Sequence, residues 1–170
     1  IGTRNLKEVV QLLQNLSASA TRNQNTLSVY PKLMVDPQLS NTIIQGGSSY
    51  LKIADGCHRT CAFCAIPLIK GPLVSRSKES VIRDALLLQD AGIKEINLIA
   101  QDVTAYGLDR GQNDALADLL TDLLPLIPNV PWVRLLYTYP GMVSDRLIEL
   151  MAAKNQLIPY LDMPLQHADP

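Results

Sequence analysis

The chain has 170 residues, 47% of them hydrophobic, and a formal net charge of −1. That length is enough for one domain with a hydrophobic core, and that composition excludes a disordered chain. The near-neutral charge argues against a broad nucleic-acid-binding surface, and no apolar run is long enough to span a bilayer. The sequence opens without a secretory leader, so we expect a cytoplasmic protein with reduced cysteines and no membrane partner.

The first 49 residues are expected to lie outside the main domain. Apolar residues recur at helical spacing in residues 4–16, with Asn5 as N-cap, which predicts a helix. Residues 17–49 are rich in Ser, Thr, Asn, Gln and Pro, which predicts a linker with one short extended piece at 42–45. We interpret 1–49 as the tail of a preceding domain plus a linker, and 50–170 as the core domain. Since the chain lacks an initiator Met, we expect a segment of a longer polypeptide.

Strands and helices alternate from Tyr50 onward. The patterns predict strands at 50–54, 94–100, 132–139 and 160–163, and helices at 78–91, 115–124 and 145–153. Ser77 and Ser144 are the expected N-caps, and Gly92 and Pro125 mark helix ends. The expected core leucines are Leu86, Leu88, Leu119, Leu120, Leu123 and Leu124. This alternation predicts right-handed crossovers and a parallel sheet, so the fold class is α/β.

Polar groups follow each predicted strand. A cysteine-containing loop follows the first strand, Gln101 and Asp102 follow the second, "TYP" follows the third, and Gln166 and His167 follow the fourth. Ligands bind at the carboxyl ends of strands in α/β sheets and barrels. We therefore expect all four groups to face one site, with Gln166 and His167 making polar contacts there.

All three cysteines of the chain lie in "GCHRTCAFC", as Cys57, Cys61 and Cys64. Thiolates are soft donors that favour zinc or an iron–sulfur cluster, and both centres usually have four protein ligands. Three donors leave one position open, where chemistry can take place. The alternative is a non-enzymatic zinc-binding module whose site a histidine closes, either His58 or His167.

The C-x3-C-x2-C spacing, with Phe63 before the last cysteine, resembles the signature of radical S-adenosylmethionine (SAM) enzymes. The resemblance implies that Cys57, Cys61 and Cys64 bind a [4Fe-4S] cluster, and that SAM chelates the open iron. One electron then cleaves SAM to methionine and a 5′-deoxyadenosyl radical. It also implies a partial (β/α) TIM-like barrel of the radical SAM type, here truncated, with an N-terminal helix and linker.

Within that family, "YLKIADGCHRTCAFCAIP" and "KGPLVSRS" resemble the methylthiotransferase branch. "AQDVTAYG", "LLYTYP" and "YLDMPLQHADP" are similar to the RimO group, which adds a methylthio group to the β-carbon of an aspartate in ribosomal small-subunit protein twelve. A tRNA adenosine methylthiotransferase, with the same chemistry on RNA, is the nearest alternative. The expected partners are therefore the ribosomal protein and a reductant such as flavodoxin or ferredoxin.

Several residues are candidates for cofactor binding beside the cysteines. The resemblance implies that Phe63 stacks near the adenine of SAM, with loop packing as the alternative. Asp102 has the chemistry to bind ribose hydroxyls or to cap the next turn, and Gln101 needs a partner at the end of a buried strand. Arg76 has the chemistry to pair with the carboxylate of SAM, or it is simply solvated. For Tyr137 and Tyr139, core packing is the expected role.

The sequence also departs from the branch that it resembles. Members carry three further cysteines in an N-terminal domain for a second [4Fe-4S] cluster, and a C-terminal RNA-binding-type domain. Neither these cysteines nor the last barrel strands are present in the 170 residues. Lys70 stands where an Arg is common. The chain alone is therefore expected to bind a cluster and cleave SAM, without completing methylthiolation.

Overall fold

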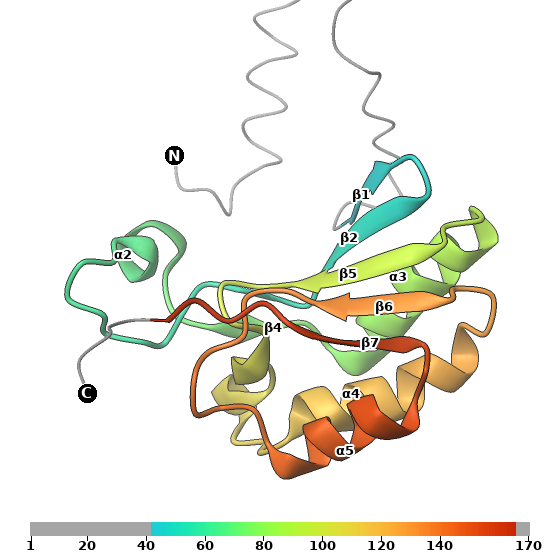
Figure 1. Cartoon of the computed structure of the whole chain (residues 1–170). Helices are drawn as coiled ribbons and strands as arrows, with labels where there is room; N and C mark the ends of the chain where they lie inside the picture. Colours follow the sequence, from blue (N-terminus) through green and yellow to red (C-terminus); the bar gives the residue numbers. More distant parts are fainter. Residues whose placement is uncertain (1–41, 166–170) are drawn as a thin grey trace, which may run out of the picture.

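The computed structural model describes residues 42–165, which form an α/β unit (Figure 1). The predicted helix at 4–16 and the candidates Gln166 and His167 lie outside the described residues. The elements are, in chain order, β1 (Thr42–Gln45), β2 (Ser48–Lys52), β3 (Ala54–Asp55), α2 (Ile66–Lys70), β4 (Val74–Ser75), α3 (Lys78–Asp90), β5 (Glu95–Ile99), the 3-10 turns η2 (Val103–Ala105) and η3 (Leu108–Arg110), α4 (Ala115–Leu123), η4 (Leu124–Leu126), β6 (Trp132–Leu135), α5 (Asp145–Ala153) and β7 (Leu157–Leu161).

The main sheet has the order β1-β2-β5-β6-β7. β2, β5, β6 and β7 run parallel, as the alternation of strands and helices predicts. The expected extended piece at 42–45 is β1, which pairs antiparallel with β2 across a hairpin, so the sheet begins before Tyr50. β3 and β4 form a separate antiparallel ribbon, in which Ala54 pairs with Ser75. The cysteine loop connects the two strands of this ribbon.

The three predicted helices are confirmed. Ser77 caps α3 by accepting a hydrogen bond from the Ser80 N–H, and Gly92 follows its end with φ +79°. Ser144 caps α5 in the same way. In these caps a hydroxyl satisfies a backbone donor that the helix itself leaves unpaired. α4 ends at Leu123, because Pro125 lies in the 3-10 turn that follows.

The last two strands differ from their predicted bounds. β6 ends at Leu135, although the apolar pattern extends to Tyr139, because Tyr137 adopts φ +65° and leaves the extended conformation. The chain nevertheless stays beside its neighbours, since the Leu136 N–H bonds to the Leu98 carbonyl and the Thr138 N–H to the Asp162 carbonyl. β7 begins at Leu157, three residues before the predicted start.

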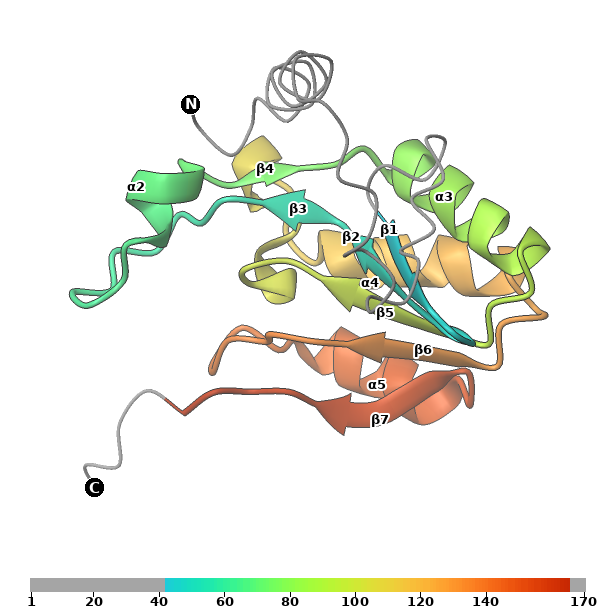
Figure 2. The same cartoon turned by 90° about the horizontal axis from the view of Figure 1, so that it is seen from above.

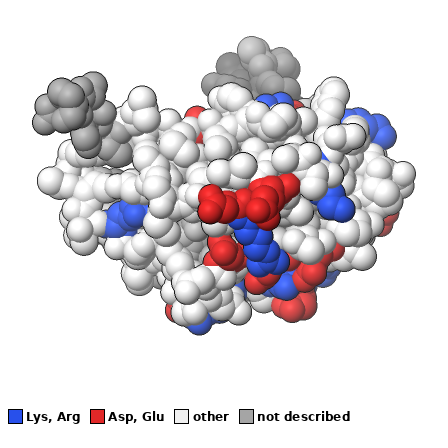
Figure 3. Space-filling view, turned by 60° about the horizontal axis from the view of Figure 1, so that its bottom comes forward, with Lys and Arg blue, Asp and Glu red and all other residues white. Residues whose placement is uncertain are grey.

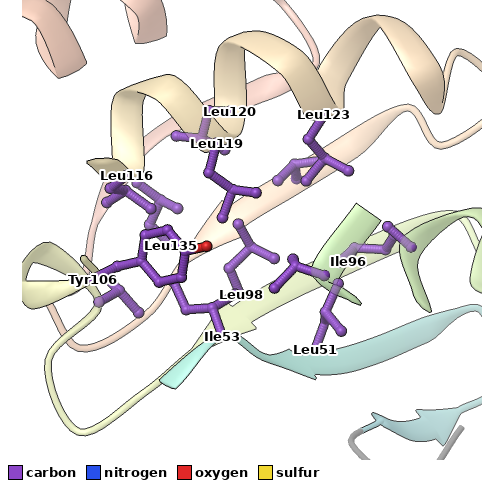
Figure 4. Packing of buried hydrophobic residues seen from close by; sticks show 14 of the residues in the cluster. Leu51, Ile53, Ile96, Leu98, Tyr106, Leu116, Leu119, Leu120, Leu123 and Leu135 are labelled. Atoms are coloured by element: carbon purple, nitrogen blue, oxygen red, sulfur yellow. The ribbon is translucent and has the colours of Figure 1, made fainter. Parts of the chain in front are cut away.

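The core lies between one face of the sheet and helices α3, α4 and α5. Leu51, Leu98 and Leu135 are adjacent in register on neighbouring strands and are fully buried. Leucines of α4 pack over them, as Figure 4 shows for Leu119, Leu120 and Leu123. Of the predicted core leucines, Leu86 is only partly buried. Among the described residues, no helix is long and apolar enough to cross a membrane.

The opposite face of the sheet carries polar side chains. Arg134 of β6 donates two hydrogen bonds to Glu95 of β5, at 2.9 and 2.8 Å, and lies near the ring of Tyr160. Asn97 bonds to Ser48 at 2.9 Å. β1 and β7 lie at opposite edges of the sheet, so the described residues form part of a barrel whose helices lie on the outer face (Figure 2).

The surface over the helices carries charges of both signs. Lys78 pairs with Asp122, and Arg146 pairs with Asp118, each at 2.6 Å. The hydrogen bond to Asp122 raises the pKa of Lys78. Figure 3 shows acidic and basic side chains lying beside each other on this face, so neither sign dominates it.

Candidate functional site

A cavity of about 430 Å³ lies at the carboxyl ends of β5 and β6, which is within the size range of small-molecule sites. Its walls come from four segments: Cys57, Arg59, Cys61, Phe63, Cys64 and Ile66 of the cysteine loop and α2, residues 100–102 after β5, residues 137–139 after β6, and Pro164 after β7. Polar residues at strand ends therefore meet the cysteines, as the sequence predicts for the first three strands.

The cysteine loop leaves β3 through a tight turn at Gly56. This residue has φ +75°, a conformation that favours glycine, and a Cβ there would lie 2.1 Å from the Pro72 carbonyl oxygen. The Cys57 N–H donates to the Gly71 carbonyl at 3.2 Å. The two arms of the loop are thus held against each other at its base, on the β3–β4 ribbon.

All three cysteines are free and border the cavity. The Arg59 N–H donates to the Cys57 Sγ at 3.5 Å, and the Ile66 N–H donates to the Cys64 Sγ at 3.4 Å. In the part of the chain that the structure describes, no three His, Cys, Asp or Glu side chains are grouped tightly enough to hold a single metal ion. In a four-iron cluster each thiolate binds a different iron, so its donors need to surround a cavity rather than a point. Three thiols around one cavity are a donor set that fits such a cluster.

Arg59 joins the cysteine loop to the sheet. Its Nε and Nη2 donate to the Asp102 Oδ2 at 2.9 and 2.7 Å, and its guanidinium carbon lies 3.4 Å from the centre of the Tyr139 ring. This contact was not predicted from the sequence. The order of the elements could have indicated it, because Asp102 follows a strand whose carboxyl end was expected to meet the loop that contains Arg59.

Asp102 borders the cavity and is also the N-cap of η2, which was the alternative expected for it. Its Oδ1 accepts hydrogen bonds from the backbone N–H and the hydroxyl of Thr104, and its Oδ2 accepts from Arg59. Both carboxylate oxygens are therefore engaged within the protein, and binding of ribose hydroxyls by Asp102 stays a prediction.

Gln101 and Phe63 both line the cavity. The Gln101 Oε1 is buried and has no hydrogen-bond partner among the described residues. A buried acceptor without a donor is costly, so this oxygen is suited to receive an N–H or O–H group from a ligand. The Phe63 side chain is 81% exposed, which leaves its ring free to stack on a planar group.

Arg76 lies away from this cavity. Its guanidinium donates to the Lys52 carbonyl at 2.8 Å and to the Asp84 Oδ2 at 2.6 Å, and Ser80 accepts from it as well. These contacts fix Arg76 between the sheet and α3, so its expected pairing with the carboxylate of SAM finds no support in this position. The alternative of a solvated side chain does not hold either, because the side chain is mostly buried.

Tyr137 and Tyr139 line the cavity, although core packing was the expected role for both. The Tyr137 side chain is 52% exposed, and its φ of +65° is unfavourable for a bulky residue. Such strained residues are concentrated at functional sites. The sequence pattern gave no sign of this conformation, since alternating residues simply extended the predicted strand.

Residues 51–170 match the family model described as the Radical SAM superfamily. Over 127 residues the chain is 52% identical to the ribosomal protein uS12 methylthiotransferase RimO of Roseiflexus sp., covering 75% of this chain and 27% of the relative. It is 48% identical to the Sorangium cellulosum protein of the same name, covering 78% and 28%. The Moorella thermoacetica protein, also of that name, is 46% identical, covering 86% and 34%. The chain thus spans about a quarter to a third of the length of these relatives.

Solved structures with the same fold include the radical S-adenosylmethionine methyltransferase TsrM from Kitasatospora setae. With cobalamin and a [4Fe-4S] cluster bound, that protein superposes with a TM-score of 0.55 at 18% identity, covering 71% of this chain and 23% of TsrM. A second TsrM structure, with tryptophan and a SAM analogue, gives a TM-score of 0.56 at 19% identity, covering 74% and 23%. At this level of identity the similarity concerns the fold alone.

Proposed function

The chain belongs to the radical SAM superfamily, and on that basis we propose that it is the cluster-binding part of a methylthiotransferase that modifies a ribosomal protein. Two observations together carry the proposal. Three cysteines surround one cavity, and about half of the aligned residues are identical to those of proteins named uS12 methylthiotransferases. The chain covers only part of those relatives, so substrate and activity are inferred for the complete protein.

Cys57, Cys61 and Cys64 would hold a [4Fe-4S] cluster, and SAM would occupy the rest of the cavity. When bound, the cluster supplies the electron for the reductive cleavage of SAM. The residues of the chain orient the ligand and exclude water. Gln101 Oε1 would accept a hydrogen bond from it, and the exposed ring of Phe63 would stack on its planar part. By the same resemblance, the complete protein would hold a second [4Fe-4S] cluster, whose three cysteines are not among the 170 residues.

The proposed substrate is an aspartate side chain of ribosomal protein uS12, which gains a methylthio group on its β-carbon. The names of the relatives and the resemblance of residues 100–107 and 135–140 to the RimO group support this choice over tRNA. A reductant such as flavodoxin or ferredoxin would deliver the electron. With a ribosomal protein as substrate, the protein would act in the cytoplasm.

The first test concerns the cluster. After anaerobic reconstitution, we expect about four iron and four acid-labile sulfide per 170-residue chain, and loss of most of both in Cys61→Ser, because one of three ligands is removed. Thr60→Ala changes the exposed neighbour of Cys61 and should retain the cluster. A full cluster in Cys61→Ser would contradict the assignment. One zinc per chain without sulfide would instead indicate a zinc-binding module.

The second test concerns the substrate. The complete protein, loaded with cluster and SAM, is incubated with purified ribosomal protein uS12 or with unmodified tRNA, and mass spectrometry identifies the methylthiolated species. We expect modification of an aspartate in the protein and none of the tRNA. Modification of a tRNA adenosine alone would reverse the choice of substrate while leaving the cluster assignment intact.

A further inference from the structure

The cysteine loop is weakly supported between its two ends. Its base is fixed by the Cys57–Gly71 backbone hydrogen bond, and its far end by the turn in which the Cys64 N–H bonds to the Cys61 carbonyl. In the described part of the chain, Arg59 provides the only side-chain hydrogen bonds that connect residues 58–63 to the sheet. The neighbours His58 and Thr60 are exposed. The position of this segment therefore depends on one side chain.

The partner of Arg59 is itself held in place. Asp102 follows β5 after Ala100 and Gln101 and caps η2 through its other carboxylate oxygen, so it cannot follow the loop if the loop moves. Tyr139, in the segment that follows the neighbouring strand β6, presents its ring to the face of the guanidinium. Asp102 thus restrains the guanidinium of Arg59 through hydrogen bonds from its edge, and the Tyr139 ring restrains it by contact with its face.

This contact is better protected from solvent than an ordinary surface ion pair. The side chains of Arg59 and Asp102 are 17% and 5% exposed. A planar guanidinium that donates two hydrogen bonds and stacks on a ring fixes orientation as well as distance, which a lysine ammonium does not. The backbone N–H of Arg59 also donates to the Cys57 Sγ, so a shift of Arg59 is transmitted to a thiol of the cavity.

We propose that Arg59 is a positioning residue that holds the cysteine loop in its cluster-binding arrangement, acting through Asp102 and Tyr139. The loop is then ordered before iron arrives, and a bound cluster is retained because Cys57 and Cys61 cannot swing away from each other. This inference rests on the proposed cluster-binding role of the cysteines. The tether itself is a property of the protein without metal and is tested separately.

The test uses the complete polypeptide and the variants Arg59→Lys, Asp102→Asn and their double combination. Arg134→Lys is the matched control, because Arg134 also donates two hydrogen bonds to a carboxylate and lies near a tyrosine ring, but it does not line the cavity. Two quantities are measured. The first is amide hydrogen exchange of the peptide spanning 56–64 in the metal-free protein. The second is the rate at which a chelator removes iron from the cluster whose electron paramagnetic resonance signal responds to SAM.

We expect Arg59→Lys to accelerate both loop exchange and iron release about tenfold, the change that corresponds to ~1.4 kcal/mol. Asp102→Asn should act in the same direction, and the double variant should add little, because the two residues act as one unit. Arg134→Lys should leave both rates within about twofold of the parent. If Arg59→Lys fails to fold, Asp102→Asn and Tyr139→Leu, which removes only the ring, carry the same comparison.

The proposal would be overturned by unchanged loop exchange in Arg59→Lys, by equal acceleration in Arg134→Lys, or by fully additive effects in the double variant. These outcomes differ from failure of the proposed function, in which the parent protein itself takes up no SAM-responsive cluster. Accelerated exchange without accelerated iron release would also overturn it, because the tether would then order the loop without serving the cluster.

Discussion

Gly56 is the residue on which the path of the cysteine loop depends most directly. Gly56→Ala should lower the free energy of unfolding by about 3 kcal/mol, because it combines an unfavourable positive φ with a Cβ placed 2.1 Å from the Pro72 oxygen. Gly111→Ala is the control, since Gly111 has φ +69° but open space around its Cβ position, and should cost about 1 kcal/mol. Urea denaturation measures both, and equal losses would show that the close contact is unimportant.

Tyr137 offers the opposite test, in which a substitution should stabilise the protein. Its positive φ costs about 1 kcal/mol and its side chain is half exposed, so Tyr137→Gly should raise the free energy of unfolding of the metal-free protein. Asp114→Gly should gain less, because aspartate tolerates its φ of +55° better. A clear loss of stability in Tyr137→Gly, seen by chemical denaturation, would mean that the ring contributes packing rather than strain.

The outcome for single site residues follows from what a sequence pattern can express. Cys57, Cys61 and Cys64 lie around one cavity because their short spacing keeps them in a single loop. Gln101 reaches the cavity because it follows the carboxyl end of β5. Arg76 does not, because its guanidinium donates instead to Asp84 of α3 and to the Lys52 carbonyl. The partners of Arg59 are Asp102, which lies 43 residues away in sequence, and Tyr139, which lies 80 residues away. Only the fold brings them together with Arg59.

At the scale of elements, the β3–β4 ribbon carries a pH-sensitive contact. Partial burial acts to raise the pKa of Asp109, but hydrogen bonds from the Ser75 hydroxyl and N–H outweigh it, and the net effect lowers this pKa. A lowered pKa stabilises the fold above the pKa of the unfolded chain, and this contribution disappears as the pH falls through the folded value. Acidification should therefore weaken the attachment of β4 to η3.

Asp109→Asn is the test of this contact. Between about pH 5 and about pH 3 its stability should fall less than that of the parent, because the amide does not take up a proton. Ser75→Ala removes the hydroxyl donor and leaves Asp109 in place. It should therefore reduce, in part, the loss of stability over the same pH range. Urea midpoints across that range decide the matter, and parallel curves for parent and Asp109→Asn would contradict it.

The elements themselves were predictable where local chemistry determines them. Helix caps at Ser77 and Ser144 and the stop near Pro125 act within a few residues, so the three helices lie where they were expected. The end of β6 is set instead by contacts of residues 136–138 with β5 and with the segment after β7. These neighbours are distant in sequence, and an alternating pattern does not report them.

At the scale of the whole molecule, the two faces of the sheet contribute unequally to stability. Leu98→Ala, in the fully buried face, should cost about 3 kcal/mol through lost burial and a residual cavity. Arg134→Ala, on the polar face, should cost less than about 1 kcal/mol, because its ion pair with Glu95 is partly hydrated. Thermal or urea unfolding of the two variants makes the comparison, and similar losses would show that the polar face is a second core.

The order of parallel strands was predictable because helices that alternate with strands permit few connections. The antiparallel hairpin of β1 and β2 was not, since 42–45 is short and follows a polar region typical of a linker. The partial barrel was expected only through resemblance to radical SAM enzymes, because strand alternation alone does not distinguish an open sheet from a barrel.

The pairing of Ala54 with Ser75 returns the chain to within one strand spacing of the point at which it left the sheet. Residues 56–73 therefore leave and rejoin the fold at the same place, and insertions or deletions within them need not displace β5, β6 or β7. The entropy of closing such a loop changes only slowly with its length. A loop of another length, or with other side chains, could accordingly replace this segment while the paired residues Ala54 and Ser75 keep their positions.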